Sequence, residues 1–290
     1  MQGGDRMPER PRQLALSCAD YTWPAVSHGV ALDLVAALGF SAVDLGLMHG
    51  RSHLKPEEIG TDVEFWAGRV RESCESRGLA VADVFYQAPD FETMSVNHPD
   101  PAEVERGRPA YERALRLASL VGSPGVTILP GVSYDGDTWE QAVDRAADEL
   151  GKRVSLAGES GLRLSVEPHV GSIVDTPERA LALLARVPGL TVTLDYGHFS
   201  YAGFTDEQIE PLTAHAGHVQ CRGATNGALQ ASMRTSTIDF GRMVAALRSH
   251  DYAGYLACEY VWADWLGCNL VDNLTETVAL RDVLREAVGA

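Results

Sequence analysis

The sequence predicts an α/β protein that folds as a single-domain (β/α)8 TIM barrel, and three observations support this prediction. Eight short apolar runs alternate with segments in which apolar residues recur at helical spacing. Such alternation is typical of a parallel sheet, and eight strand–helix units are the number that closes a barrel. The 290 residues exceed the roughly 250 that these barrels commonly take. We expect the barrel to span residues 13–290, behind a flexible polar tail over residues 1–12.

The predicted strands are short runs rich in Val, Leu, Ala and Cys, as expected for strands that are buried on both faces. In chain order they are Leu14–Cys18, Ala42–Leu47, Ala80–Tyr86, Val126–Leu129, Leu162–Val166, Leu190–Leu194, Ala216–Val219 and Gly254–Cys258.

Glycine, threonine and proline mark several ends of the predicted helices. The first three helices end at Gly39, Gly78 and Gly122, because glycine is favoured just beyond a helix C-terminus. The fifth begins at Thr176 and Pro177, which suit the N-cap and the first helical position. The expected helical segments cover residues 31–38, 63–74, 115–121, 139–154, from 176 onward, 206–214, 240–247 and 275–288.

Three connections are longer than the others, and all three leave the C-terminal ends of predicted strands. They are Met48–Ile59, Gln87–Pro101 and Arg222–Thr237. Long connections inside a compact fold are usually functional loops or lids. We expect the second and third to close over a substrate.

Composition and charge restrict the class of protein. The formal net charge is −16, which opposes the phosphate charge of nucleic acid and disfavours a nucleic-acid enzyme. The five cysteines are odd in number and lack disulfide or zinc-site spacing. No apolar run reaches the roughly 18 residues of a membrane span. We therefore expect a reduced, cytoplasmic protein without membrane or nucleic-acid partners, and a homo-oligomer is compatible with these features.

A metal-type ligand follows each of the last four predicted strands. Glu167, Asp195, Gln220 and Glu259 are separated by roughly one strand–helix–strand unit of about 30 residues. A single acidic residue after a strand is usually a turn or capping residue. Four ligands in register instead place oxygen atoms together at the C-terminal mouth of a barrel, where active sites lie. This hard, oxygen-rich set predicts one divalent metal ion, Mn²⁺ or Mg²⁺ rather than zinc.

Two carboxylates on opposite sides of such a metal can also move a proton. Glu167 and Glu259 are expected to act as base and acid on a substrate whose carbonyl and hydroxyl oxygens bind the metal. This is the apparatus for enediolate chemistry. His169 is a candidate further base.

Several polar and aromatic residues near the predicted mouth are candidates for substrate binding, each with an alternative. His198 could contact a substrate oxygen or hold a carboxylate in place. Arg222 could bind an anionic group of the substrate or neutralise the acidic cluster. Trp262 could stack on a sugar or aglycone face or pack within the last loop. His53 could reach the site from a long loop, and His218 is either a site residue or a core histidine.

The chain resembles the sugar phosphate isomerase/epimerase family, whose barrels are related to xylose isomerase and endonuclease IV. The resemblance runs from Leu14 to Val288. Its more specific motifs are Val166-Glu167-Pro168-His169, Thr176-Pro177-Glu178, Leu194-Asp195-Tyr196-Gly197-His198, His218-Val219-Gln220, Ile238-Asp239-Phe240 and Gly254-Tyr255-Leu256-Ala257-Cys258-Glu259.

The resemblance implies a xylose isomerase-like TIM barrel that binds a divalent metal through Glu167, Asp195, Gln220 and Glu259, with His198 on the substrate. Many members carry histidine where Gln220 stands, whereas those similar to hydroxypyruvate isomerase carry glutamine. Ketose 3-epimerases usually carry an arginine in the stretch that here reads Gly223-Ala224-Thr225-Asn226-Gly227. The segment 168–176 is also similar to that of inosose dehydratases.

The leading functional hypothesis is a metal-dependent isomerase or epimerase of a small sugar or sugar-derived carbonyl compound. The alternative is a lyase of the same fold, either a keto-inositol-type dehydratase or an enzyme that cleaves 3-oxo-glycosides or C-glycosides. Both begin with abstraction of an α-proton, so the metal site does not choose between them. A non-catalytic sugar-binding subunit is disfavoured because binding alone needs no acid–base pair.

Overall fold

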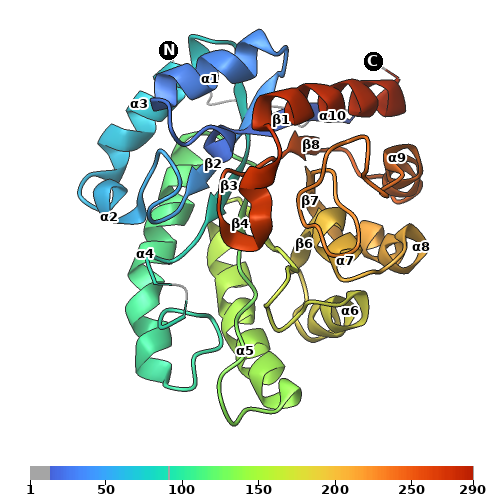
Figure 1. Cartoon of the computed structure of the whole chain (residues 1–290). Coiled ribbons are helices and arrows are strands. Elements are labelled where there is room, and N and C mark those ends of the chain that lie inside the picture. Colours follow the sequence, from blue (N-terminus) through green and yellow to red (C-terminus); the bar gives the residue numbers. More distant parts are fainter. Residues whose placement is uncertain (1–13, 91, 290) are drawn as a thin grey trace.

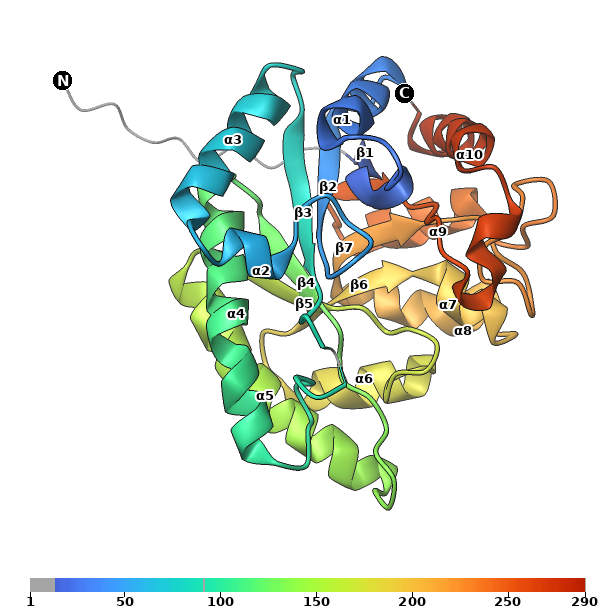
Figure 2. The same cartoon turned by 60° about the vertical axis from the view of Figure 1, so that its left-hand side comes forward.

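Eight parallel strands form a closed barrel in the order β1 to β8, with helices around the outside (Figure 1). The computed structural model describes residues 14–90 and 92–289, so the tail predicted over residues 1–12 lies outside the described residues. Figure 2 shows α3, α4 and α5 on one side of the strands and α8, α9 and α10 on the other. The predicted fold class, a single (β/α)8 TIM barrel, is confirmed.

All eight predicted strands are present, and β2 and β3 have the predicted bounds. β7 continues two residues beyond its predicted end, so that Gln220 lies within the strand. The strands are β1 (Ala15–Ala19), β2 (Ala42–Leu47), β3 (Ala80–Tyr86), β4 (Gly125–Ile128), β5 (Arg163–Val166), β6 (Thr191–Asp195), β7 (Ala216–Cys221) and β8 (Tyr255–Cys258). Pairing of β8 with β1 closes the barrel.

The predicted helices are also present. They are α1 (His28–Ala37), α3 (Val63–Glu75), α4 (Pro101–Leu120), α5 (Trp139–Glu159), α6 (Pro177–Arg186), α8 (Asp206–Ile209) continuing as η2 (Glu210–His215), α9 (Phe240–Ser249) and α10 (Asn273–Val288). Short elements that the sequence did not indicate are η1 (Asp20–Thr22), α2 (Pro56–Ile59), α7 (Tyr196–Tyr201) and η3 (Trp265–Leu270).

Helix α4 differs most from its prediction, because it begins well before the apolar stripe at residues 115–121. Gly107 and Pro109 interrupt the helical pattern, and both residues are poor helix formers. Gly107 is nevertheless required by packing, since an added Cβ atom would lie 3.3 Å from Cβ of Met94. Tertiary contact therefore determines the first half of this helix.

The middle of the barrel is filled by a hydrogen-bonded polar layer. His218 on β7 is fully buried, and its Nε2 lies 2.5 Å from Oδ2 of Asp44 on β2. Burial opposes a charged imidazole, but the charges of Asp44 and Asp83 outweigh it and raise the pKa of His218. Thr127 donates to Asp83 at 2.6 Å in the same layer. His218 is thus a partnered core histidine, and the polar layer forms the floor under the barrel mouth.

Within residues 14–90 and 92–289, no helix has both the length and the apolar composition needed to cross a membrane.

Candidate active site

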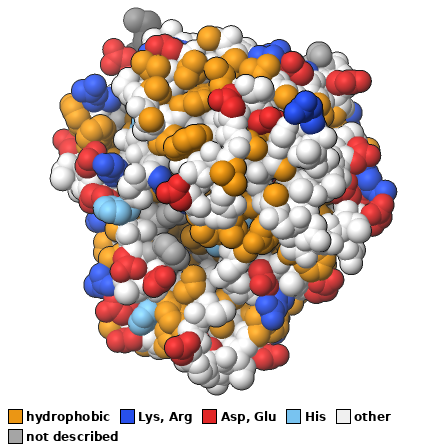
Figure 3. All heavy atoms as spheres, viewed as in Figure 1, with side chains coloured by type: hydrophobic (Ala, Val, Ile, Leu, Met, Phe, Trp, Pro, Cys, Tyr) orange, Lys and Arg blue, Asp and Glu red, His pale blue; other side chains and the backbone are white. Residues whose placement is uncertain are grey.

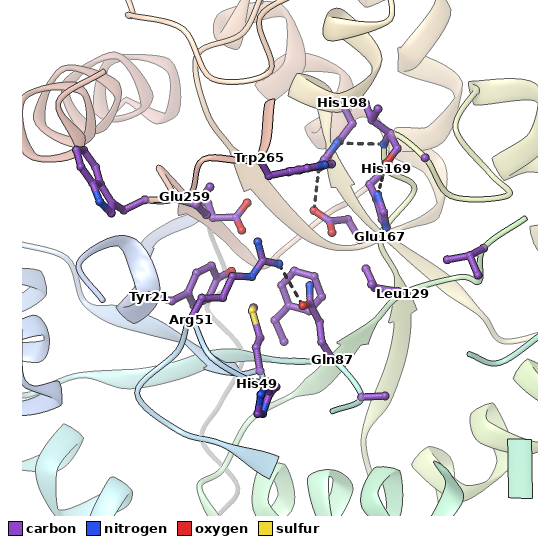
Figure 4. A pocket seen from close by; sticks show the side chains of 18 of the residues that line it. Tyr21, His49, Arg51, Gln87, Leu129, Glu167, His169, His198, Glu259 and Trp265 are labelled. Atoms are coloured by element: carbon purple, nitrogen blue, oxygen red, sulfur yellow. Dashed lines mark hydrogen bonds and ion pairs between the residues drawn. The ribbon is translucent and has the colours of Figure 1, made fainter. Parts of the chain in front are cut away.

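A cavity of about 500 Å³ opens at the C-terminal ends of the strands. Figure 3 shows this face of the molecule, where apolar side chains border the hollow together with charged ones. Every strand is followed by at least one residue that lines the cavity, and Figure 4 shows several of these converging on it. Taking one cavity-lining residue after each strand, from β1 to β8, gives Tyr21, Arg51, Gln87, Leu129, Glu167, His198, Arg222 and Glu259.

Glu167, Asp195 and His198 form the centre of the site, with ligand atoms that all lie within 4.8 Å of one another. Asp195 ends β6 and caps α7, accepting a hydrogen bond from the Gly197 amide at 2.7 Å. The first turn of α7 then places His198 beside Asp195, because residues three apart share a helix face. His198 Nε2 lies 3.3 Å from Oε1 of Glu167 and 3.7 Å from Oδ2 of Asp195.

The hydrogen bonds of His198 define what its ring can do. Its Nδ1 accepts from the backbone amide of Val170 at 3.3 Å, so in the neutral ring the proton is on Nε2. Nε2 therefore donates to Glu167 and offers no lone pair to a cation. This arrangement fits a residue that orients Glu167 and presents an N–H to the pocket.

Arg222 lies between two of the carboxylates. It is buried, its Nε donates to Oδ2 of Asp195 at 2.7 Å, and its Nη2 donates to Oε2 of Glu259. Burial opposes the guanidinium charge, but Asp195 and Glu259 outweigh this effect and raise the pKa of Arg222. Of the two roles considered for Arg222, neutralising the acidic cluster is the one seen in this structure. Three carboxyl groups lie around this one guanidinium, whose charge can balance only one carboxylate.

Glu167 and Glu259 have proton affinities that are shifted in opposite directions. Burial disfavours the Glu167 carboxylate, but the hydrogen bond and charge of His198, with His169 and Arg222, lower its pKa to about 2. Burial raises the pKa of Glu259 to about 8, with the charges of Glu167 and Asp195 adding to the effect against that of Arg222. Two carboxylates with separated pKa values are what an acid–base pair requires.

Gln220 leaves a buried acceptor without a partner. Its Nε2 donates to the Tyr21 hydroxyl at 3.0 Å, whereas its Oε1 has no hydrogen-bond partner within the described part of the chain. Buried polar atoms are normally satisfied. An unpartnered amide oxygen suits a divalent cation, which Glu167, Asp195, Gln220 and Glu259 would hold. Among the described residues, the acidic and histidine ligand atoms that lie within 4.8 Å of one another are those of Glu167, Asp195 and His198, without Glu259.

His169 presents a free lone pair to the cavity. Its Nδ1 donates to the Val170 carbonyl at 2.6 Å, which fixes the tautomer, and no partner for Nε2 is found among residues 14–90 and 92–289. Burial lowers the pKa of His169 to about 4, so the ring is neutral near pH 7. The expected base is thus brought to the site as an acceptor next to Glu167.

Of the other two residues expected to bind substrate, one lines the cavity and one does not. Trp262 lines the cavity and is 52% exposed. His53 does not line the cavity, because its ring stacks on His28 with the centroids 5.1 Å apart. The structure therefore separates His53 from the other residues expected to bind substrate.

Among the polar side chains that line the pocket, sequence reasoning missed Tyr21, Arg51 and Gln87. Arg51 Nη2 donates to Oε1 of Gln87 at 3.1 Å across two loops. Their positions in the chain could have identified these residues as pocket residues. Tyr21 follows the end of β1, Arg51 lies in the long connection after β2, and Gln87 begins the long connection after β3. Their residue types alone did not indicate a place in the pocket.

The loop after β7 lies beside the pocket instead of over it. Arg222 is its lining residue, whereas Gln230 is buried and holds the neighbouring loop after β8. Gln230 Nε2 donates to the carbonyls of Val261 and Cys268, and Oε1 accepts from the Val261 amide at 2.8 Å. In this structure the expected lid thus supports the segment that carries Trp262 and Trp265.

Comparison with known proteins identifies the family. A model of the xylose isomerase-like TIM barrel matches residues 32–287. The chain belongs to this family. The matched range includes every candidate metal ligand and acid–base residue, and the family resemblance inferred from the motifs is confirmed.

Solved structures of similar fold include two sugar epimerases and a protein with a bound zinc atom. D-allulose 3-epimerase from Methylomonas sp. has a TM-score of 0.74 at 17% identity, covering 96% of this chain and 99% of its own. 3-Keto-D-glucoside 4-epimerase from E. coli has a TM-score of 0.69 at 14% identity, covering 96% and 100%. The IOLI protein with a bound zinc atom has a TM-score of 0.72 at 13% identity, covering 95% and 98%. No curated protein matches the chain in sequence. At these identities the similarity shows the fold.

Proposed function

We propose that this family member is a divalent-metal-dependent isomerase or epimerase of a small sugar or sugar-derived carbonyl compound. The observation that carries the proposal is the Glu167/Glu259 pair, two buried carboxyl groups that line one cavity and are held by His198 and Arg222. An ionised carboxyl group can accept a proton from carbon, and a protonated one can supply it. Binding alone needs no such pair.

The residues of the site then have distinct roles. Glu167 takes the proton from the carbon next to the substrate carbonyl, and the N–H of His198 keeps its carboxylate in position. Glu259 delivers a proton to the resulting enediolate, and Arg222 holds that side chain in place. The Nε2 atom of His169 accepts a hydrogen bond from a substrate hydroxyl.

A Mn²⁺ or Mg²⁺ ion is proposed as the cofactor, held by Glu167, Asp195, Gln220 and Glu259. When bound, it would polarise the carbonyl oxygen and lower the pKa of the neighbouring C–H group. The unpartnered Gln220 Oε1 and the carboxyl groups around Arg222 support it. The zinc atom in the similar IOLI structure supports a metal-binding protein of this fold but favours no particular ion.

The sugar substrate is supported by the similar structures, which are an allulose epimerase and a ketoglucoside epimerase. The five cysteines are free and buried, which supports the proposed cytoplasmic location.

A lyase is the second candidate. Elimination starts with the same proton abstraction but ends by protonating a leaving group. Glu259, buried and held by Arg222, lines the cavity where such a leaving group would lie. The reaction outcome must therefore be measured.

Incubation in D₂O distinguishes these possibilities. Metal-loaded protein is incubated with ketoses, keto-inositols and 3-oxo-glycosides, and products are analysed by NMR and mass spectrometry. An isomerase or epimerase product retains its atoms and carries deuterium at the reacting carbon, whereas a lyase product has lost water or an aglycone. Chelator-treated protein and Glu167→Gln are the controls. Equal turnover in the chelated sample would contradict metal dependence.

A further inference from the structure

A second, much smaller cavity adjoins the candidate active site beside the ends of β3 and β4. Its volume is about 30 Å³, which is room for one water molecule or one monatomic ion. The two cavities share lining residues, including Gln87 and Leu129, which Figure 4 labels at the main cavity. Most of the remaining wall is apolar and includes Met94, Val96 and Ile128.

Two buried polar side chains that line this small cavity each have an atom without a partner. Tyr86 ends β3 and is 2% exposed, and Arg153 lies on α5 and is 3% exposed. The Tyr86 Oη and Arg153 Nη2 atoms have no hydrogen-bond partner within residues 14–90 and 92–289. Both atoms carry protons, and a guanidinium cannot accept a hydrogen bond. Buried polar groups are normally satisfied, so both donors call for an acceptor.

The charges around Arg153 favour an anion as this acceptor. The carboxylate partner of Arg153 is the buried Glu149, with Nε of Arg153 3.0 Å from Oε1. The other oxygen of Glu149 lies 2.9 Å from Nη2 of Arg108. Lys152 and Glu105 also join this cluster, but both are more than half exposed and interact with solvent. In the buried part of the cluster, two guanidinium groups therefore share one carboxylate.

The hydroxyl of Tyr86 is also close to positive charge. Burial raises the pKa of Tyr86 to about 12, although the charges of Arg153 and Arg113 act to lower it. The hydroxyl therefore keeps its proton near pH 7 and can donate it. The Nε atom of Arg113 has no hydrogen-bond partner in the described part of the chain either. This neighbourhood is positive although the whole chain has a net charge of −16.

Both donors are held in place by one aromatic ring. Cζ of Arg153 lies 4.7 Å from the ring centroid of Tyr111, and the Tyr111 hydroxyl donates to the Arg153 carbonyl at 3.0 Å. The ring of Tyr86 packs against the same side chain, with the centroids 6.3 Å apart. Because Glu149 and Tyr111 fix the guanidinium, Nη2 of Arg153 is not free to turn towards another partner. Donors that are already ordered lose less entropy when a ligand binds.

We propose that this cavity binds one monatomic anion, which is chloride under ordinary conditions, through the Tyr86 hydroxyl and Nη2 of Arg153. Polyatomic anions such as phosphate are larger than the space available. The anion would fix the start of the connection at 87–101, because Tyr86 directly precedes Gln87, whose side chain lines the main cavity and bonds to Arg51. The proposed acid–base and metal-ligand residues do not line this cavity, so the proposal is independent of the proposed function.

Thermal unfolding of the purified full-length protein tests the site in solution. Sodium chloride is compared with sodium gluconate at equal ionic strength, because gluconate is too large for the cavity. We expect chloride to raise the unfolding midpoint by about 2–4 °C, the shift given by a ligand at roughly ten times its dissociation constant. In Tyr86→Phe, which loses one donor to the anion, the chloride concentration for half of this shift should rise about 10-fold or more.

Tyr252→Phe is the matched control, because it removes a tyrosine hydrogen bond, to the Tyr255 carbonyl, away from this cavity. It should keep the full chloride shift. Crystals of the parent protein grown with sodium bromide provide a direct second measurement, since bromide scatters anomalously. We expect an anomalous peak between Tyr86 and Arg153.

The remaining outcomes overturn the proposal. Equal midpoints in chloride and gluconate, or the same chloride dependence in Tyr86→Phe and the parent, would leave a water molecule as the acceptor. A bromide peak without a chloride-dependent shift would show an adventitious ion only. If Tyr86→Phe does not fold, the chloride shift and the bromide peak of the parent decide together, and absence of either one overturns the anion site.

Discussion

The side-chain amide of Gln220 donates a hydrogen bond to the hydroxyl of Tyr21 at 3.0 Å, joining residues 199 positions apart in the chain. Gln220 ends the inward-facing series of β7, and Tyr21 follows β1 in η1. Because the amide nitrogen is held by Tyr21, the Oε1 atom is directed elsewhere and remains without a partner in the described structure. Tyr21 thereby determines which atom of Gln220 is offered to a cation.

Replacement Tyr21→Phe should weaken metal binding while the fold persists. The amide of Gln220 would lose its anchor, and loss of such an outer partner typically costs about 10- to 100-fold in metal affinity. Isothermal titration with Mn²⁺ measures the change. Tyr252→Phe is the matched control, because it also removes one tyrosine hydrogen bond, to the Tyr255 carbonyl, away from the site. Equal affinity in both variants would show that Tyr21 does not position Gln220.

Replacing either carboxylate of the acid–base pair should affect turnover more than substrate binding. Glu167→Gln and Glu259→Gln keep side-chain size but remove proton transfer, so kcat should fall by roughly 10²- to 10⁴-fold. Steady-state kinetics with a substrate found in the D₂O screen provides the measurement. A near-normal kcat in either variant would show that another group transfers that proton, and His169 would be the first to test.

Arg222→Met should destabilise the protein strongly when no metal is added. The substitution leaves Asp195 and Glu259 buried without their guanidinium partner, and breaking a buried ion pair in this way costs about 3–5 kcal/mol. Saturating Mn²⁺ should recover part of the loss, since the cation compensates the same carboxylates. Urea unfolding with and without Mn²⁺ tests this. The exposed Arg116–Glu64 pair provides the comparison, where Arg116→Gln should cost about 1 kcal/mol or less.

The neutral state of His169 predicts a stability loss in mild acid. Burial lowers its pKa to about 4 in the folded protein, below the roughly 6.5 of an unfolded chain. Above about pH 6.5, His169 is unprotonated in both the folded and the unfolded protein. Between about pH 6.5 and pH 4, only the unfolded protein binds a proton at this residue, so the free energy of unfolding decreases as the pH falls. The contribution is on the order of 1–3 kcal/mol.

Urea unfolding at pH 7.5 and pH 5 measures this effect as a difference between variants. His169→Gln should lose less stability between the two pH values than the parent protein. His250→Gln, at an exposed position, should behave like the parent. Identical losses in parent and His169→Gln would show that His169 is not held neutral.

Periodicity predicted the barrel well because the strands are short and each helix carries a local apolar pattern. The alternation of apolar runs and terminal glycines such as Gly39 and Gly78 required no knowledge of distant contacts. Helix α4 shows the limit, since it contains Gly107 and Pro109, which are poor helix formers. Met94 packs closely against Gly107, where a larger residue would be crowded, and such a contact cannot be predicted from the apolar pattern.

For the candidate site as well, some features could be predicted from the sequence and others could not. The position of Glu167, Asp195, Gln220 and Glu259 at one end of the barrel could be predicted because the ends of parallel strands meet at one edge, whatever the side-chain conformations. The partners of Arg222 could not, because they depend on how three side chains from three strands orient. His53 and Arg51 lie two positions apart in one loop, yet Arg51 faces the cavity and His53 stacks on His28. Loop direction of this kind is set by tertiary contacts.

The pocket residues come from two different halves of the barrel, and this affects how the substrate range of the protein can evolve. The proposed acid–base and ligand residues lie at or just after the C-terminal ends of β5 to β8. Other side chains that line the pocket come from β2, β3, β4 and the loops after them, namely Met48, Arg51, Phe85, Gln87, Leu129 and Val132. The two halves of the barrel can therefore diverge under separate selection. Exchange of the connections at 48–59 and 87–101 with those of a relative is a route to a new substrate range in which the proton-transfer chemistry is inherited unchanged.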